Sequence, residues 1–239
     1  MNGKLGREKG IVSTLRERAQ RHRFAYLMTS LILIALLSPY LQRTPIGIVI
    51  VTLMIAFVLL SGVDAVSDRK RDIVIASILG LLWIIGIFIN FILYKINAAL
   101  FEEYLPSGIL FFGFVTVRIL SHILRTREIT SETLYAAVCV YFLMGITWAT
   151  AFLLIEKFIP GSFHISHDRN LDKAMTGSDT IYYSFVTLVT LGYGDITPAT
   201  NEAKSLAVLE AIAGQLYLTI LVARLVSLYS SKFSKGEDK

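Results

Sequence analysis

The chain has 239 residues, of which 54% are apolar and 17% are charged, and its mean hydropathy is +0.63. A water-soluble domain of this length rarely has so apolar a composition, which argues against an ordinary soluble enzyme or binding module and favours a membrane protein. The net charge of +5 is best interpreted from where the basic residues lie along the chain.

Residues 1–23 form the first predicted unit, a basic segment that we expect to lie in the cytoplasm. Seven of these residues are Lys or Arg, which is typical of a helix that contacts solvent or lipid headgroups rather than nucleic acid. A secretory signal is an alternative, but no small-residue cleavage pattern follows the first apolar run. We therefore expect this run to be a membrane helix.

Six apolar windows predict membrane-spanning helices, because about 20 residues are needed to cross a hydrocarbon layer about 30 Å thick. The single cysteine, Cys139, lies in the fifth window and has no partner for an intrachain disulfide. The windows cover residues 24–41, 46–63, 73–94, 105–124, 134–155 and 206–229.

The positions of Lys and Arg predict the orientation of these helices. Basic residues are concentrated near both termini and in the turns at 68–72 and 124–128. The positive-inside rule places these regions, and therefore both termini, in the cytoplasm. The predicted units are the segment 1–23, a four-helix domain at 24–124, a polar linker at 125–133, a second membrane domain at 134–230 and a cytoplasmic tail at 231–239.

The long connection at residues 156–204 contains a short apolar stretch at 179–189. Eleven residues are too few to span a bilayer, so we expect a re-entrant helix that enters the membrane and returns on the same side. Ser178 or Asp179 is the expected N-cap, with a carboxylate near the positive end of the helix dipole. The negative end of the dipole then points into the membrane.

The sequence TLGYGD follows this short helix at residues 190–195. Irregular backbone at membrane depth is tolerated only where protein or a water-filled cavity surrounds it. Gly192 and Gly194 can adopt positive φ at alternate positions, which turns successive carbonyl groups to one side. The carbonyls of Thr190, Leu191, Gly192 and Tyr193, with the Thr190 hydroxyl, could then replace the water shell of a monovalent cation. Four copies of the chain would complete the cage.

Residues 134–229 resemble the potassium channel superfamily, because an outer helix, a pore helix, a TLGYGD filter and an inner helix follow in that order. The resemblance implies that Tyr193 packs outward, that Tyr182 and Tyr183 occupy positions often held by tryptophan, and that Asp195 lies at the outer mouth and bonds to Tyr182. Leu191 departs from the usual Val or Ile, and we expect conduction to survive because the filter uses its carbonyl.

The last predicted helix contains a glycine, Gly214, twenty residues after Gly194. In related inner helices a glycine at this place is taken as a gating hinge, but small residues also allow close helix packing. Helical spacing also predicts that one stripe of this helix lines an inner cavity, although a core-packing stripe would look the same. The stripe consists of Gln215, Leu218, Val222 and Val226.

We also predict roles for two ionisable residues of the same helix. Glu210 is an ionisable group at membrane depth, which is a functional candidate by default. We expect it to brace the filter by bonding to Ser184 or Thr187, and the alternative is that it titrates. Arg224 is expected to extend its side chain to the inner membrane surface.

The four-helix domain is voltage-sensor-like in layout, but it lacks a full arginine ladder. A ladder has an arginine at every third residue, but the positions three and six residues after Arg118 hold Ser121 and Leu124. Moving one charge per subunit is worth at most about 2.3 kcal/mol per 100 mV. Asp64 and Asp72 lie at helix ends, and we expect no buried acid to pair with an arginine. The pattern predicts weak or absent voltage dependence, with Arg118 as a weak sensor.

The outer loop offers His164, His167 and Asp168, which could bind a metal but are better explained as a solvated turret. No nucleotide loop, HExxH motif or serine elbow is present, so we do not expect an enzyme. The sequence therefore predicts an all-α membrane protein with six spanning helices and a re-entrant pore helix. The expected assembly is a homotetramer in the cell membrane that conducts K+ without organic cofactor, nucleic acid or cytoplasmic ligand. The alternative is a non-conducting subunit or scaffold.

Overall fold

The computed structural model describes residues 23–41, 45–66, 70–95, 104–126, 130–166 and 175–237. These residues are largely helical, and the helices follow the apolar windows closely. The elements in chain order are α2 (Arg23–Leu41), α3 (Pro45–Ala65), α4 (Lys70–Lys95), α5 (Leu105–Arg125), α6 (Ser131–Phe158), β1 (Phe163–Ile165), α7 (Gly177–Leu188), β2 (Ile196–Pro198) and α8 (Asn201–Glu237).

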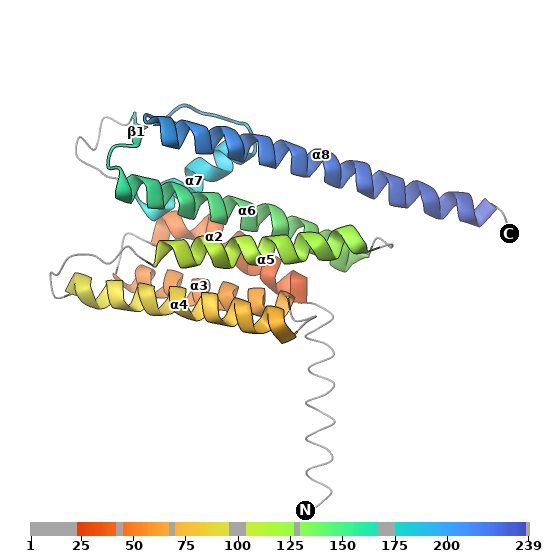
Figure 1. The fold of residues 1–239 in the computed structure, drawn as a ribbon, viewed down its shortest axis with the longest axis horizontal. Helices are drawn as coiled ribbons and strands as arrows, with labels where there is room; N and C mark the ends of the chain where they lie inside the picture. Colours follow the sequence, from red (N-terminus) through yellow and green to blue (C-terminus); the bar gives the residue numbers. More distant parts are fainter. Residues whose placement is uncertain are drawn as a thin grey trace, which may run out of the picture.

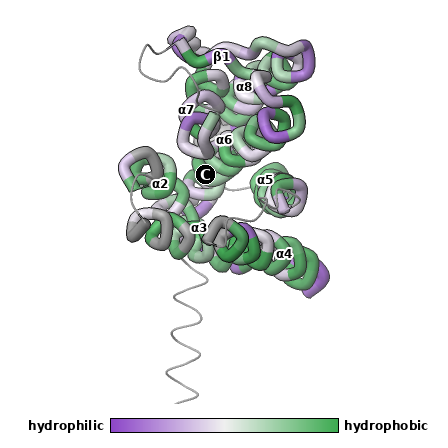
Figure 2. The backbone as a smooth tube through the Cα atoms, turned by 90° about the vertical axis from the view of Figure 1, so that its left-hand side faces the viewer, coloured by the Kyte–Doolittle hydropathy of each residue, from purple (hydrophilic) through white to green (hydrophobic). Residues whose placement is uncertain are grey.

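The helices form two adjoining groups (Figure 1). Helices α6, α7 and α8 lie together on one side, α3 and α4 lie on the other, and α2 and α5 lie between them. Helix α5 packs against α6 and α4, and α2 packs against α3 and α6. Hydrophobic residues predominate along the helices (Figure 2). Many large hydrophobic side chains of these helices are exposed in the single chain, as expected of surfaces that face lipid.

Four helices are long and apolar enough to cross a membrane: Lys70–Asn90, Leu105–Arg125, Ser131–Phe158 and Asn201–Arg224. Two shorter apolar helical stretches, Arg23–Leu37 and Leu53–Ala65, precede them. The chain is thus a membrane protein, while the predicted count of six spans stays a prediction.

The core of the four-helix domain depends on small residues that face a phenylalanine. Phe111 of α5 is fully buried. A Cβ added at Gly62 of α3 or at Gly80 of α4 would lie 3.2 or 3.3 Å from its ring. Apolar burial drives little association between helices in lipid, so close contact of this kind is the main source of their packing energy.

An ion pair also joins α4 to α5, contrary to the expectation that no buried acid pairs with an arginine. Asp72 lies in the first turn of α4 and is only 8% exposed. Its carboxylate accepts a hydrogen bond from the Arg118 guanidinium of α5. The expectation was wrong because α5 packs along α4, which brings residues 46 positions apart into contact.

The described residues are mostly helical, in agreement with the predicted all-α class, and two short strands accompany the helices. Strands β1 and β2 pair in antiparallel register, with His164 opposite Thr197. Three-residue strands carry too little periodicity to be predicted from sequence. Together they form a ribbon near the end of α6 and the start of α8 (Figure 1).

The contact between α6 and α7 generates a prediction for Gly145→Ala. A Cβ at Gly145 would lie 2.8 Å from the Phe185 ring of α7, so the ring or one of the two helices must shift. Overpacking of this kind costs about 1–3 kcal/mol. The purified variant should therefore unfold at a lower temperature than the unmodified chain in the same detergent.

Gly113→Ala is the matched control, since no atom lies within 4 Å of a Cβ at Gly113 of α5. Alanine favours a helix over glycine by about 1 kcal/mol, so this variant should unfold at the same or a higher temperature. Equal melting temperatures for all three proteins would contradict close packing at Gly145.

Candidate functional site

Helix α7 is positioned by a capping box at its start. Thr176 is the N-cap, and its side chain accepts a hydrogen bond from the N–H of Asp179. The Asp179 carboxylate accepts one from the N–H of Thr176 in return. The expected cap, Ser178 or Asp179, was wrong because the helix begins earlier, at Gly177. Asp179 instead supplies the acidic residue of the box at N3, the third residue of the helix.

The chain turns back against the end of this helix. The N–H of Thr190 donates to the carbonyl of Thr187 at 2.9 Å, and the N–H of Leu191 donates to that of Val186 at 2.9 Å. The N–H of Gly192 also points to the Val186 carbonyl, at 3.4 Å. The last carbonyl groups of α7 lack partners within the helix, and they accept these N–H groups instead. They therefore hold in place the strand at residues 190–194, which is separate from β1 and β2.

The backbone alternates in hand along this strand. The φ angles of Thr190, Gly192 and Gly194 are 57°, 58° and 81°, so positive φ occurs at every second residue. The two glycines were predicted to adopt this conformation, but Thr190 was not, because a left-handed non-glycine residue costs about 1–2 kcal/mol. Among the described residues, no backbone N–H donates to the carbonyls of residues 190–193.

This strand lies on the surface of the single chain. The side chains of Leu191 and Tyr193 are 54% and 67% exposed. Most of the Tyr193 side chain is therefore free of contacts within its own chain, and the outward packing implied by the family resemblance would need a neighbouring copy.

The end of the strand is tied to α7 by a tyrosine. Tyr182 Oη donates to Asp195 Oδ2 at 2.8 Å, which is the hydrogen bond that the resemblance implies. Burial, the hydrogen bond to Asp195 and the negative charge of Asp195 raise the pKa of Tyr182 to about 12. The hydroxyl therefore stays protonated near neutral pH and keeps donating to the carboxylate.

The neighbouring tyrosine faces a different environment. Tyr183 is 6% exposed and packs edge-on against Phe152 of α6 and Phe163 of β1, with ring centroids 5.0 and 5.2 Å apart. Such aromatic pairs add about 0.5–1.5 kcal/mol beyond their buried area. Tyr183 thus fixes α7 to α6 and to the ribbon within one chain.

A second carboxylate, besides that of Asp195, forms hydrogen bonds in this region and was not predicted from the sequence. Glu156, near the end of α6, is 5% exposed, and it accepts hydrogen bonds from the N–H groups of Gly161 and Phe163. The N–H of Ser166 then donates to the carbonyl of Asp195 at 2.8 Å. The sequence contained one signal for this role, because Glu156 is an ionisable residue directly after the apolar window 134–155 and shortly before Pro160-Gly161.

The first part of α8 passes close behind the strand. A Cβ at Gly214 would lie 2.7 Å from the carbonyl oxygen of Leu188, so Gly214 permits close contact with the end of α7. Gln215 Nε2 lies 3.5 Å from Thr190 Oγ1. Further along, the predicted stripe is exposed in the single chain, at 38–59% for Leu218, Val222 and Val226.

Arg224 does not simply extend to the membrane surface as expected. Its Nη2 donates to the carbonyls of Leu124 and Thr126, at 2.6 and 2.9 Å. These carbonyls lie at the end of α5, where a cation is favoured by the helix dipole. The sequence could not reveal this contact, because it joins residues about 100 positions apart.

Glu210 is fully buried, with Oε1 2.5 Å from Ser184 Oγ of α7. Ser184 is one of the two partners proposed from the sequence. Of the candidate metal ligands, His167 and Asp168 lie outside the described residues, and His164 is exposed on β1. The described residues contain no group of three metal-ligating side chains.

Part of the chain is similar in sequence to known proteins. Residues 128–231 match the family described as "Ion channel". The "Potassium channel protein kcv" of Paramecium bursaria Chlorella virus 1 is 38% identical over 64 residues, which are 26% of this chain and 68% of the viral protein. The chain belongs to the potassium channel superfamily.

Two plant members of the superfamily are also similar. The "Two pore potassium channel c" of Oryza sativa subsp. japonica is 37% identical over 87 residues, or 36% of this chain. The "Two-pore potassium channel 4" of Arabidopsis thaliana is 43% identical over 49 residues, or 20% of this chain. The matched region spans 17% of each plant protein's length.

The Tyr182–Asp195 contact generates a prediction for this potassium channel homologue. Tyr182→Phe and Asp195→Asn should each lower the melting temperature in detergent, and the double variant should lose less than the two single losses combined. A single hydrogen bond contributes about 1 kcal/mol, so the coupling should be of that order.

Tyr183→Phe is the matched control, because it removes a neighbouring hydroxyl from the same helix. Combined with Asp195→Asn, it should give additive losses. Additive losses for Tyr182→Phe as well would contradict a stabilising role of the hydrogen bond.

Proposed function

We propose that the chain is a subunit of a channel that conducts K+ selectively and passively, with residues 190–194 as the selectivity filter. The observation that carries this proposal is the alternation of backbone hand at Thr190, Gly192 and Gly194, which leaves four carbonyl groups without backbone donors. Carbonyl oxygens of this kind replace the hydration shell of K+. The names of the matched relatives also support K+ as the transported ion.

The proposed assembly is a homotetramer. One strand offers oxygens on one side of an ion only, and Leu191 and Tyr193 are exposed in the single chain. Cyclic symmetry closes a ring of identical strands around one axis. Four copies would surround each ion with eight oxygens, with several ions in file.

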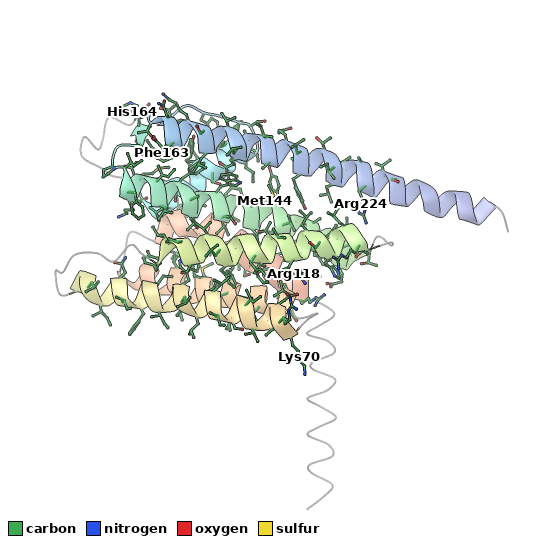
Figure 3. All side chains as sticks on the ribbon, in the orientation of Figure 1. Lys70, Arg118, Met144, Phe163, His164 and Arg224 are labelled. Carbon is green, nitrogen blue, oxygen red and sulfur yellow. The ribbon has the colours of Figure 1, made fainter. Side chains whose placement is uncertain are left out.

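The charged residues support the proposed orientation. Lys70, Arg118 and Arg224 lie toward one end of the helices, and Phe163 and His164 lie at the other end (Figure 3). The positive-inside rule then favours a filter that faces outward and cytoplasmic termini in the cell membrane. Asp195 would lie at the outer mouth and attract cations.

The inner helix α8 is the proposed gate. The exposed stripe of Leu218, Val222 and Val226 would line the path below Gln215, and an apolar constriction there can close by dewetting. The contact of Gly214 with Leu188 favours a packing role for this glycine, while α8 continues through it as one helix.

The four-helix domain at 24–124 is proposed to give weak or no voltage dependence. Its span contains Arg118, which is paired with the buried Asp72. Strongly voltage-gated channels move three or four charges per subunit, and removing one partner of a buried pair carries a further penalty.

Substitution of Gly192 tests the filter. Gly192→Ala places a side chain at φ 58°, which costs about 1–2 kcal/mol and turns the neighbouring carbonyls. The reversal potential under a Na+/K+ gradient should shift toward that of a non-selective pore, or the current should disappear. Current recordings from the purified protein in planar bilayers measure the reversal potential, and rubidium uptake into K+-loaded vesicles shows whether the protein conducts.

Gly161→Ala is the matched control, because Gly161 has φ 83° and its Cβ would also meet nothing within 4 Å, but it lies outside the filter. It should carry the same backbone strain and leave selectivity unchanged. Unchanged selectivity in Gly192→Ala would contradict the filter assignment. No rubidium uptake by the unmodified protein would favour a non-conducting scaffold.

Voltage steps over roughly −100 to +100 mV test the role of Arg118. The open probability should change little across this range, because one paired charge per subunit couples weakly to the field. Arg118→Gln should leave the voltage response unchanged while lowering stability through the unpaired Asp72. A steep rise of open probability with voltage in the unmodified channel would refute the proposal.

A further inference from the structure

Ser184 lies where three helices of the second membrane domain meet. Its hydroxyl oxygen is 2.7 Å from the carbonyl oxygen of Gly145 in α6 and 2.5 Å from Oε1 of Glu210 in α8. Ser184 and Glu210 are both fully buried. Both distances fall within the hydrogen-bond range for oxygen pairs, so each contact requires a hydrogen atom between its two oxygens.

The number of available hydrogens decides the protonation state of Glu210. A serine hydroxyl carries one hydrogen, a backbone carbonyl carries none, and a carboxylate carries none. If Glu210 were ionised, Ser184 could donate to one partner only, and the other pair of oxygens would face each other at 2.5 or 2.7 Å without a hydrogen. A carboxylic acid at Glu210 supplies the missing hydrogen.

The surroundings of Glu210 agree with a neutral side chain. Its second oxygen, Oε2, is buried and has no hydrogen-bond partner among the described residues. The titratable groups that face it are two phenols, Tyr141 of α6 and Tyr183 of α7. Within the part of the chain that the structure describes, no salt bridge joins Glu210 to a cation. A buried charge without a partner is strongly disfavoured.

We propose that Glu210 is a neutral carboxylic acid whose O–H donates a hydrogen bond to Ser184 Oγ, while the Ser184 hydroxyl donates one to the Gly145 carbonyl, so that one chain of hydrogen bonds joins α8, α7 and α6. Burial is already complete in a single chain, so added subunits cannot bring water to this site. Neighbouring hydrogen bonds in such a chain polarise and strengthen each other.

The consequence for the filter rests on the proposed function. Ser184 lies two residues before Val186, whose carbonyl accepts the N–H of Leu191. Gly214, one turn after Glu210 on α8, lies against the carbonyl of Leu188. Glu210 is therefore a positioning residue: it holds the end of α7, which in turn holds the filter strand.

Infrared spectroscopy tests the proton directly and does not depend on conduction. The unmodified protein in vesicles at neutral pH should show the C=O stretching band of a protonated carboxyl group, and Glu210→Gln should remove it. Glu202→Gln is the matched control, because Glu202 lies on the same helix and is exposed; it should leave the band in place. Loss of only a carboxylate band in Glu210→Gln would overturn the proposal.

Permeability ratios test the positioning role. Glu210→Gln keeps an N–H donor for Ser184 and should keep the K+/Na+ permeability ratio within about twofold, whereas Glu210→Ala should reduce it at least about tenfold. A Glu210→Gln protein that fails to assemble, or that loses selectivity as Glu210→Ala does, would show that a charge is needed and would overturn the proposal. A carboxyl band without any K+ current would leave the proton in place and refute the proposed function instead.

Discussion

The structure depends on one constraint, which is that backbone polar groups at membrane depth need partners. Helix α7 meets it for the first residues of the strand at 190–194: the Thr187 carbonyl accepts the N–H of Thr190, and the Val186 carbonyl accepts the N–H groups of Leu191 and Gly192. The carbonyls of the strand are left without backbone donors. In the proposed function, ions take the place of those donors, so the same constraint explains both the fold of this region and its conduction of K+.

The remaining contacts of the second membrane domain hold α7 from several sides. Gly145 of α6 and Gly214 of α8 allow both helices to approach α7 closely, and Ser184 bridges the same two helices through hydrogen bonds. On the ribbon side, Glu156 fixes the turn before β1. The strand is therefore supported on its helix side and at its outer end, while the face proposed to line the pore is free.

The two groups of helices meet through α5. This helix packs along α6, and Arg224 of α8 donates to the carbonyls at its C-terminal end. Any displacement of α5 would therefore be felt by α8 near the exposed stripe that we propose as the gate. Arg118, the charge on α5 within the membrane span, is held by Asp72 of α4. This arrangement suits a domain that supports the channel more than one that moves its charges through the field.

The sequence by itself determined the features that depend on neighbouring residues: the positions of the apolar helices, the positive φ of Gly192 and Gly194, and the family to which residues 134–229 are similar. Apolar runs and glycine conformations follow from local chemistry. Only the tertiary structure decided the pairing of Asp72 with Arg118, the cap that Arg224 places on α5 and the left-handed conformation of Thr190. The ion pair and the Arg224 cap join residues far apart in the chain, and the conformation of Thr190 is imposed by α7 against its own preference, so no local pattern could reveal them.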